Sequence, residues 1–190
     1  MYLPNQDLNL HIHSRLYLTG FMGAGKSTIG KILAHRIGYR FYDTDHLVMR
    51  GFRKPVSQIF DENGEEEFHK AELLVLHELA RRNRVVVSTG GGTLVRDDAF
   101  HIARNSGTLV YLRAPVSDLY ERVLFSPKDR PVVDVPDTET AFRQRFEERR
   151  RYYEQSDLTV DTIGRRPDDV VKDIISGLDL KVVRHGEKRG

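Results

Sequence analysis

The sequence predicts an α/β fold of three layers, in which a parallel β-sheet lies between two layers of helices. Short apolar runs alternate along the chain with longer amphipathic segments, which is the order expected of a parallel sheet. The run at residues 85–89 is apolar and β-branched at successive positions, as in strands that are buried on both faces. A chain of 190 residues is long enough to form one domain with a substantial core.

The apolar pattern places each element in turn. Strands are expected at residues 15–19, 40–42, 85–89, 108–112 and 158–160. Apolar residues at helical spacing predict helices over residues 27–37, 64–82, 97–104, 115–124, 138–154 and 167–177. Gly38 follows the first of these helices and is expected to end it.

The segments outside this pattern define the expected organisation. Residues 1–14 are polar and unpatterned, so we expect a flexible arm before a single domain over residues 15–178. Residues 125–137 contain three prolines and no periodicity, and an irregular stretch of this length inside a domain is typical of a functional lid. Residues 179–190 are expected to form a basic tail.

Composition excludes several classes of function. Thirty Lys and Arg side chains nearly balance 28 Asp and Glu side chains, which argues against a nucleic-acid-binding protein. The absence of Cys excludes disulfides, thiol catalysis and cysteine-based zinc sites. No apolar run approaches the length of a membrane span, and the first residues lack the features of a signal peptide. We therefore expect a cytoplasmic monomer that binds small molecules, with no nucleic-acid or membrane partner.

A phosphate-binding pattern occupies residues 20–27, which read Gly-Phe-Met-Gly-Ala-Gly-Lys-Ser and match G-x-x-x-x-G-K-[ST] between a strand and a helix. The glycines let backbone N–H groups turn toward phosphate oxygens, and the helix points its positive end at the same anion. Lys26 can reach the β- and γ-phosphates, and the Ser27 hydroxyl can bind Mg²⁺. The residues predicted here to bind ATP are Gly23, Ala24, Gly25, Lys26, Ser27 and Thr28.

Two further motifs favour a small-molecule kinase over other proteins with this loop. Asp43 and Asp45 follow the second strand, and in an extended chain they point the same way. One can then serve Mg²⁺ while the other binds an acceptor hydroxyl; a helix N-cap explains one of the two, but not both. Gly90, Gly91 and Gly92 follow a buried strand, where they either let a ligand approach the backbone or form a tight turn.

With these motifs the sequence resembles the shikimate kinase family, within the nucleoside-monophosphate-kinase-like P-loop proteins. The resemblance extends from about residue 15 to residue 177. It rests on residues 20–28, on Phe-Tyr-Asp-Thr-Asp at 41–45, on the glycine triplet and on Asp-Arg-Pro at 129–131. It implies a five-stranded parallel sheet, a helical region that binds shikimate and a mobile lid. The implied activity is ATP-dependent phosphorylation of the 3-hydroxyl of shikimate, with Mg²⁺ as cofactor.

The resemblance also implies roles for individual residues. Asp45 binds the ring hydroxyls and assists deprotonation of the attacking one, while Asp43 supports Mg²⁺ with Ser27. Gly91 lies against the substrate, between the other two glycines of the triplet, and Arg149 matches the arginine that binds the substrate carboxylate. The implied catalytic residues are Lys26, Asp45 and Arg130, the last from the lid. Residues near positions that border the adenine are Arg122, Arg165 and Pro167.

One position departs from the pattern of the family. His69 stands where the family usually has an arginine that shares the substrate carboxylate, and a neutral imidazole offers neither a fork nor a fixed charge. Either the bound carboxylate keeps His69 protonated, or Lys70 or another residue substitutes, or the acceptor differs. A helix-surface residue without a ligand is the remaining alternative.

This departure keeps two other functions open. One is a kinase of a different polyol or cyclitol acid. The other is a weakly catalytic P-loop protein that binds nucleotide and regulates a partner.

Overall fold

The computed structural model describes residues 14–125 and 138–183 of the chain. The predicted arm over 1–14 therefore lies outside the described residues except for Ser14. The predicted lid over 125–137 also lies outside them except for Phe125, and so does Arg130. Of the predicted tail, residues 179–183 are described.

Five parallel strands form one sheet in the order β2-β3-β1-β4-β5. Their bounds are β1 Arg15–Thr19, β2 Arg40–Asp43, β3 Val85–Ser88, β4 Thr108–Arg113 and β5 Leu158–Asp161. The central strand β1 pairs with β3 on one side and with β4 on the other. The predicted α/β class with a five-stranded parallel sheet is confirmed.

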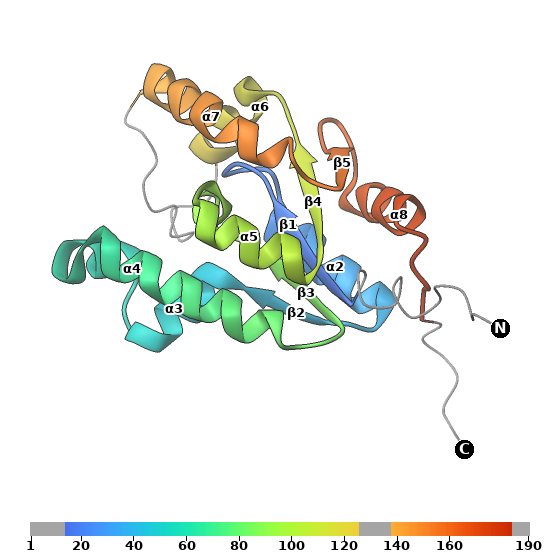
Figure 1. The fold of residues 1–190 in the computed structure, drawn as a ribbon. Coiled ribbons are helices and arrows are strands. Elements are labelled where there is room, and N and C mark those ends of the chain that lie inside the picture. The colour runs from blue at the N-terminus through green and yellow to red at the C-terminus, as the bar shows by residue number, and fades with distance from the viewer. Residues whose placement is uncertain (1–13, 126–137, 184–190) are drawn as a thin grey trace.

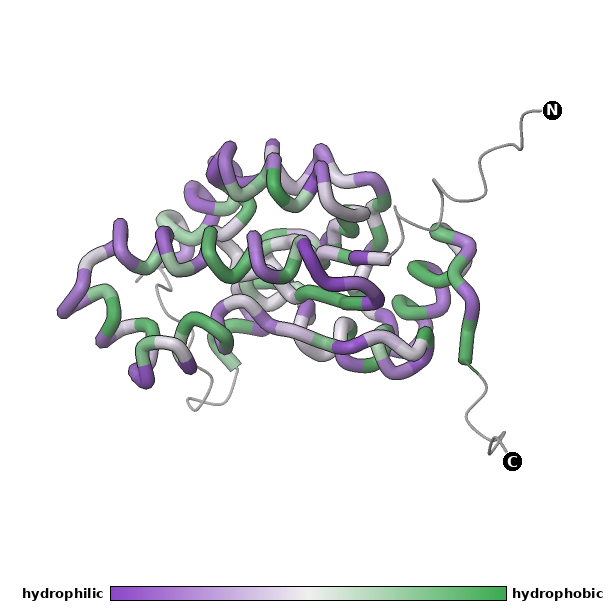
Figure 2. Tube along the Cα trace, turned by 60° about the horizontal axis from the view of Figure 1, so that its bottom comes forward, coloured by the Kyte–Doolittle hydropathy of each residue, from purple (hydrophilic) through white to green (hydrophobic). Residues whose placement is uncertain are grey.

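Helices cover both faces of this sheet, with α2 and α8 on one face and α4 and α5 on the other (Figure 1). Along these helices hydrophobic and hydrophilic segments alternate, as expected of amphipathic helices (Figure 2). The helices are α2 Lys26–Ile37, α3 Thr44–Phe52, α4 Val56–Ala80, the 3₁₀ turn η1 Thr93–Val95, α5 Asp97–Ser106, α6 Val116–Leu124, α7 Glu139–Tyr153 and α8 Pro167–Gly177.

The core follows from the alternation of side chains along the strands. Leu16 and Leu18 of β1 belong to the cluster beneath α2 and α8, whereas Tyr17 belongs to the cluster beneath α4 and α5. All three side chains are fully buried. Because a slip of one residue would exchange the two faces, this packing also determines the register of the sheet.

The chain after β2 differs from the sequence-based prediction. Helix α3 begins at Thr44, directly after the last residue of the strand, so Asp43 and Asp45 are not two residues apart in an extended segment. That argument for their common direction was wrong, because Asp43 caps a helix whose first turn contains Asp45. The next helix, α4, begins at Val56 and not at the expected residue 64. Gly64, with φ 83° and ψ 164°, interrupts it where the prediction placed its start.

The described part of the tail packs against the domain. The Leu180 N–H donates to the Ile175 carbonyl at 2.9 Å, and the Val183 N–H donates to the Arg36 carbonyl at the same distance. The other predicted elements agree with the structure within two residues at each end. Across residues 14–125 and 138–183, no helix is long and apolar enough to cross a membrane.

Two glycines test how tightly α2 packs on the sheet. A Cβ at Gly30 would lie 2.6 Å from the Phe41 ring and 3.1 Å from Leu18, whereas a Cβ at Gly51 of α3 would meet nothing within 4 Å. We expect Gly30→Ala to lower the free energy of unfolding by about 1–3 kcal/mol, because Phe41 must move. Gly51→Ala should raise it by about 0.4–1 kcal/mol through reduced freedom of the unfolded chain. Urea denaturation measures both, and equal effects would contradict the tight contact at Gly30.

Candidate active site

The phosphate-binding loop joins β1 to α2, and its glycines adopt conformations that other residues rarely reach. Gly20 has φ 136°, and a Cβ there would lie 2.7 Å from the Leu112 carbonyl oxygen. Gly25 caps α2 at φ 87°. Lys26, the first residue of α2, donates from Nζ to the carbonyls of Gly20 at 2.7 Å and Phe21 at 3.1 Å. The ammonium group is thus held inside the curve of the loop.

The charge of Lys26 depends on its neighbours. Burial lowers the pKa of Lys26 below its ordinary value, and the positive charge of Arg149 acts in the same direction. The carboxylates of Asp45 and Asp43 oppose this by favouring the protonated form. A polyanion bound in the loop would favour protonation further, so the charge of Lys26 is best satisfied when such a ligand is present.

Ser27 and Asp43 meet across the ends of α2 and β2. The Ser27 hydroxyl donates to Asp43 Oδ2 at 2.7 Å and lies 3.3 Å from the Ser88 hydroxyl of β3. The other oxygen, Asp43 Oδ1, accepts the His46 N–H at 3.2 Å and caps α3. A carboxylate beside hydroxyl groups is the hard oxygen donor set that Mg²⁺ prefers. The predicted metal residues Ser27 and Asp43 are therefore brought together.

Asp45 lies in the first turn of α3, against the glycine turn that follows β3. Burial raises the pKa of Asp45, and the negative charges of Asp43 and Glu72 raise it further against the opposing charge of Lys26. The backbone N–H of Gly90 donates to the Thr44 hydroxyl at 2.9 Å, which joins α3 to the turn. A Cβ at Gly90 would collide with Asp45 Oδ1, so only glycine fits beside this carboxylate.

Arg149 reaches the same turn from α7. A Cβ built on Gly92 would lie 3.4 Å from the Arg149 guanidinium, which also lies over the Phe21 ring at 5.8 Å. The Tyr153 hydroxyl donates to the Gly91 carbonyl at 2.5 Å and fixes the end of α7 to the turn. The Arg149 guanidinium and the Asp45 carboxylate of α3 are both close enough to the Lys26 ammonium for their charges to act on it.

His69 lies on α4 between two carboxylates. Its Nδ1 is 2.8 Å from Glu72 Oε2, and its Nε2 is 3.2 Å from Glu65 Oε1. Hydrogen bonding to Glu72, with a further contribution from Glu65, raises the pKa of His69 against the opposing effects of burial and of the charge on Arg96. The Lys70 ammonium, in contrast, pairs with Glu66 and Glu67 on the exposed side of the helix.

Glu72 is a site residue that the sequence analysis missed. It is only 4% exposed, and its Oε1 accepts a hydrogen bond of 2.5 Å from the Thr93 hydroxyl in η1. The same carboxylate therefore ties α4, through His69, to the segment after the glycine turn. Its spacing of three residues from His69 is the only signal in the sequence, and a glutamate-rich helix obscures it.

Of the three residues predicted near the adenine, Arg122 contacts the phosphate loop, whereas Arg165 contacts α8 and Pro167 begins that helix. The Arg122 guanidinium of α6 donates to the Gly23 carbonyl and to the Thr162 carbonyl, both at 3.3 Å, so it lies against the phosphate loop. Arg165 instead donates to Asp173 of α8 at 2.5 Å. Pro167 is the first residue of α8.

Comparison with known proteins identifies the family. A family model described as shikimate kinase matches residues 22–179, which is most of the chain. The chain belongs to the shikimate kinase family. A shikimate kinase of Chlorobium luteolum is 37% identical over 193 residues, covering 97% of this chain and 95% of the relative. A shikimate kinase of Chlorobium chlorochromatii is 40% identical over 169 residues, covering 85% of this chain and 88% of the relative.

Solved structures of shikimate kinases have the same architecture. The shikimate kinase of Acinetobacter baumannii, a structure in complex with shikimate, superposes with a TM-score of 0.81 at 31% identity. The match covers 89% of this chain and 94% of the other. The predicted resemblance is therefore confirmed for the family and for the fold.

The ion pairs of His69 predict a pH-dependent contribution to stability. Because the folded state raises the pKa of His69, this contribution is complete below the unfolded value of about 6.5 and is lost as pH rises through the folded value. Wild type should exceed His69→Gln in free energy of unfolding by about 1–2 kcal/mol at pH 6, and by less at pH 9.

Lys70→Gln is the matched control on the same helix, since its ion pairs are exposed to solvent. Urea denaturation from pH 6 to pH 9 should show a constant difference in free energy of unfolding between wild type and Lys70→Gln. A difference between wild type and His69→Gln that grows with pH would contradict the arrangement.

Proposed function

We propose that this protein transfers the γ-phosphoryl group of ATP to the 3-hydroxyl of shikimate. The observation that carries the proposal is the approach of Asp45 and Arg149 to the glycine turn after β3, with Lys26 close enough for its charge to interact with both. An ammonium for a phosphate, a carboxylate for a hydroxyl and a guanidinium for a carboxylate are the groups that this reaction needs. Membership of the shikimate kinase family supports the same assignment.

ATP would bind along the loop between β1 and α2. The loop N–H groups and the start of α2 face the phosphates, and the Lys26 ammonium neutralises the charge that spreads over the transferred group. Arg122 contacts this loop at the Gly23 carbonyl, and its place beside the adenine stays a prediction. Contacts of Arg165 and Pro167 with the adenine, and closure of Arg130 over the phosphates, stay predictions.

Mg²⁺ fits the oxygen atoms at the end of β2. The Ser27 hydroxyl and the Asp43 carboxylate, 2.7 Å apart, would hold the ion, with Ser88 nearby. Bound there, the ion would supply positive charge beside the phosphates. Because Asp43 also caps α3, the metal site and the first turn that contains Asp45 are positioned by one side chain.

Asp45 would orient the attacking hydroxyl and accept its proton. Its carboxylate lies against Gly90 in the space that a Cβ would occupy, so the absence of a side chain at Gly90 lets Asp45 approach the glycine turn closely. The raised pKa of Asp45 makes it a better proton acceptor than an ordinary aspartate. Arg149 beside Gly91 and Gly92 would bind the carboxylate of shikimate, with His69 as its predicted partner.

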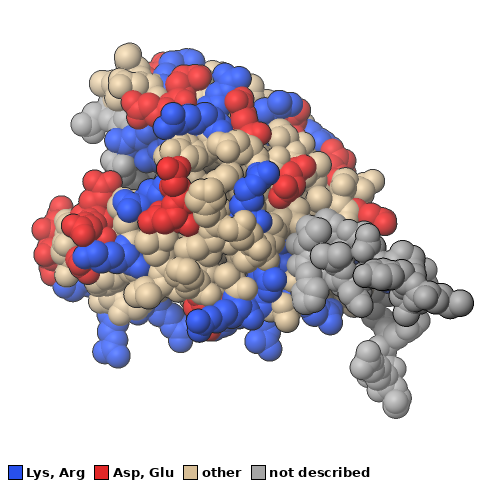
Figure 3. Space-filling view, in the orientation of Figure 1, with Lys and Arg blue, Asp and Glu red and all other residues tan. Residues whose placement is uncertain are grey.

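We further propose a monomer that acts in the cytoplasm on small molecules, without a nucleic-acid partner. Basic and acidic side chains are mixed over the face shown in Figure 3, and acidic ones gather where α4 lies. A duplex would instead favour a continuous basic surface.

An ADP-release assay tests the function. With ATP and Mg²⁺, we expect turnover with shikimate to exceed turnover with quinate or gluconate at equal concentration. Faster turnover with quinate or gluconate would assign the chain to another acid acceptor, as the substitution at His69 allows. ATP binding without turnover of any of the three would favour a regulatory protein.

A pair of variants separates the two aspartates. Asp45→Asn should keep ATP binding and lower kcat by about 10²–10⁴-fold, because an amide cannot accept the hydroxyl proton. Asp43→Asn should instead raise the Mg²⁺ concentration needed for half-maximal rate, because a charge beside the ion is lost. Steady-state rates over a Mg²⁺ series measure both, and identical metal dependence in the two variants would refute the division of roles.

A further inference from the structure

The substrate carboxylate needs a fixed positive charge that His69 does not offer. Both ring nitrogens of His69 already face carboxylates, those of Glu72 and Glu65. Even with His69 protonated, the three side chains together carry a net negative charge. An incoming carboxylate would be repelled by this group, so another cation is required near His69.

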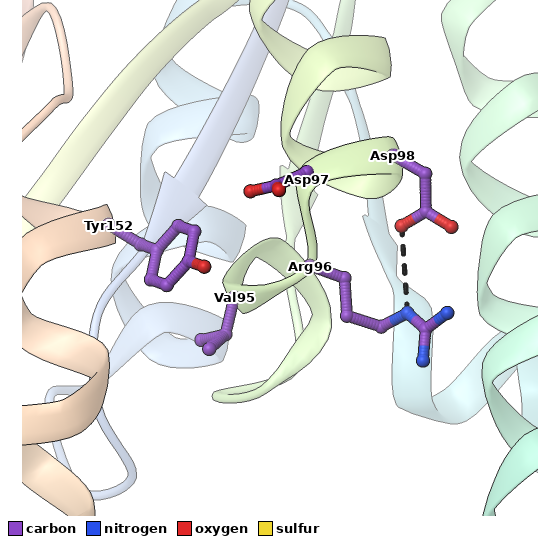
Figure 4. A pocket seen from close by; sticks show the side chains of 5 residues that line it. All are labelled: Val95, Arg96, Asp97, Asp98 and Tyr152. Atoms are coloured by element: carbon purple, nitrogen blue, oxygen red, sulfur yellow. Dashed lines mark ion pairs between the residues drawn. The ribbon is translucent and has the colours of Figure 1, made fainter.

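Arg96 is the cation that the described structure places there. It follows η1 and precedes α5, only four residues after the glycine triplet. The Thr93 hydroxyl of η1 donates to Glu72 of α4, so Arg96, three residues after Thr93, follows a segment that contacts α4. The charge of Arg96 lowers the pKa of His69 on that helix. Figure 4 shows the side chain extending away from Tyr152, with Nε toward Asp98.

The position of Arg96 relative to the glycine turn is held by buried contacts. The Thr93 hydroxyl of η1 donates to Glu72, and the other oxygen of Glu72 contacts His69. Thr93 is itself tied to the turn, because its N–H donates to the Gly90 carbonyl at 3.2 Å. The backbone that presents Arg96 is therefore fixed to the turn that Arg149 contacts.

The guanidinium of Arg96 forms a long, solvent-exposed ion pair within the protein. The ion pair that involves it, to Asp98, measures 3.5 Å from Nε, and both side chains are about half exposed. Such a surface pair contributes little, so a substrate carboxylate can compete for the guanidinium. Asp98 can keep contact with Nε while the two terminal nitrogens bind a ligand.

The open cavity beside Arg96 is not itself an anion site. It has a volume of about 460 Å³ and is lined by Val95, Arg96, Asp97, Asp98 and Tyr152 (Figure 4). Its two aspartates outnumber its one arginine, and Arg96 extends out of it. An anion that binds Arg96 would therefore meet its guanidinium outside this cavity.

We propose that Arg96 provides, with Arg149, the second fixed positive charge that binds the carboxylate of the acceptor, in the role that His69 cannot fill. The inference rests on the proposed function, since it assumes an acceptor that carries a carboxylate. Arg96 is then a specificity-determining residue of this chain.

The test compares Arg96→Gln and Arg96→Lys with wild type in steady-state kinetics. Arg96→Gln should raise the KM for shikimate by about 30-fold while kcat changes less than about threefold, because the contact is made equally in ground and transition states. Arg96→Lys should give an intermediate KM, since lysine keeps the charge without the fork. The KM for ATP should not change.

Arg104→Gln is the matched control, because Arg104 lies in the last turn of α5, the helix that Arg96 precedes, and donates to the Gln155 carbonyl. It should leave the KM for shikimate as in wild type. Circular dichroism and thermal melts confirm that each variant is folded; should Arg96→Gln fail to fold, Arg96→Lys still reports the loss of the fork.

The methyl ester of shikimate distinguishes a contact to the carboxylate from a general disturbance. Wild type should prefer shikimate to the ester in kcat/KM, and Arg96→Gln should lose most of that preference. Adding His69→Arg to Arg96→Gln should restore it, because a guanidinium then returns to the family's usual position.

Two results would overturn the inference. One is an unchanged KM for shikimate in Arg96→Gln, and the other is an equal loss of kcat/KM for the acid and the ester. Both leave the proposed function intact as long as wild type phosphorylates shikimate. If wild type does not phosphorylate shikimate, the proposed function fails, and the inference fails with it.

Discussion

The register of three parallel strands is the constraint on which the site depends. Strands β2, β3 and β1 end at one edge of the sheet, where Asp43 pairs in register with Ser88 and Ser88 pairs with Leu18. The segments that follow these strands therefore lie at the same edge of the sheet. They are the first turn of α3 after β2, the glycine turn after β3 and the phosphate loop after β1. The alternating burial of Leu16, Tyr17 and Leu18 maintains this register. The geometry of the site therefore depends on the packing of the core.

Charges at this edge are arranged for ligands that bring charges of their own. Lys26 is half-buried, which lowers its pKa, whereas Asp45 is half-buried near other carboxylates, which raises its pKa. Neighbouring groups whose pKa values are both shifted in this way are typical of functional sites. A nucleotide polyphosphate would favour the charged ammonium. The ammonium would thereby stabilise the negative charge on the phosphoryl group during its transfer.

How much the sequence revealed depended on whether the signal was local. The residues of the phosphate loop are contiguous and lie between a strand and a helix, so they could be recognised without the fold. Helix α3 was not predicted, because Asp43 and Asp45 were interpreted as an extended acidic pair; the alternative of a helix N-cap at one of them is confirmed for Asp43. Glu72 was missed because a buried glutamate resembles its exposed neighbours in sequence. Its importance depends on Thr93, 21 residues away, which only the folded chain brings close.

The most direct test of the account is the position of phosphate on the product. The enzyme is incubated with ATP, Mg²⁺ and shikimate, and phosphorus–proton correlation NMR is recorded on the purified product. The proposed transfer to the 3-hydroxyl, with Asp45 as the proton acceptor, predicts one product, whose phosphorus couples to the proton on ring carbon 3. Coupling to the proton of another ring carbon, or release of inorganic phosphate without a phosphorylated acceptor, would contradict it.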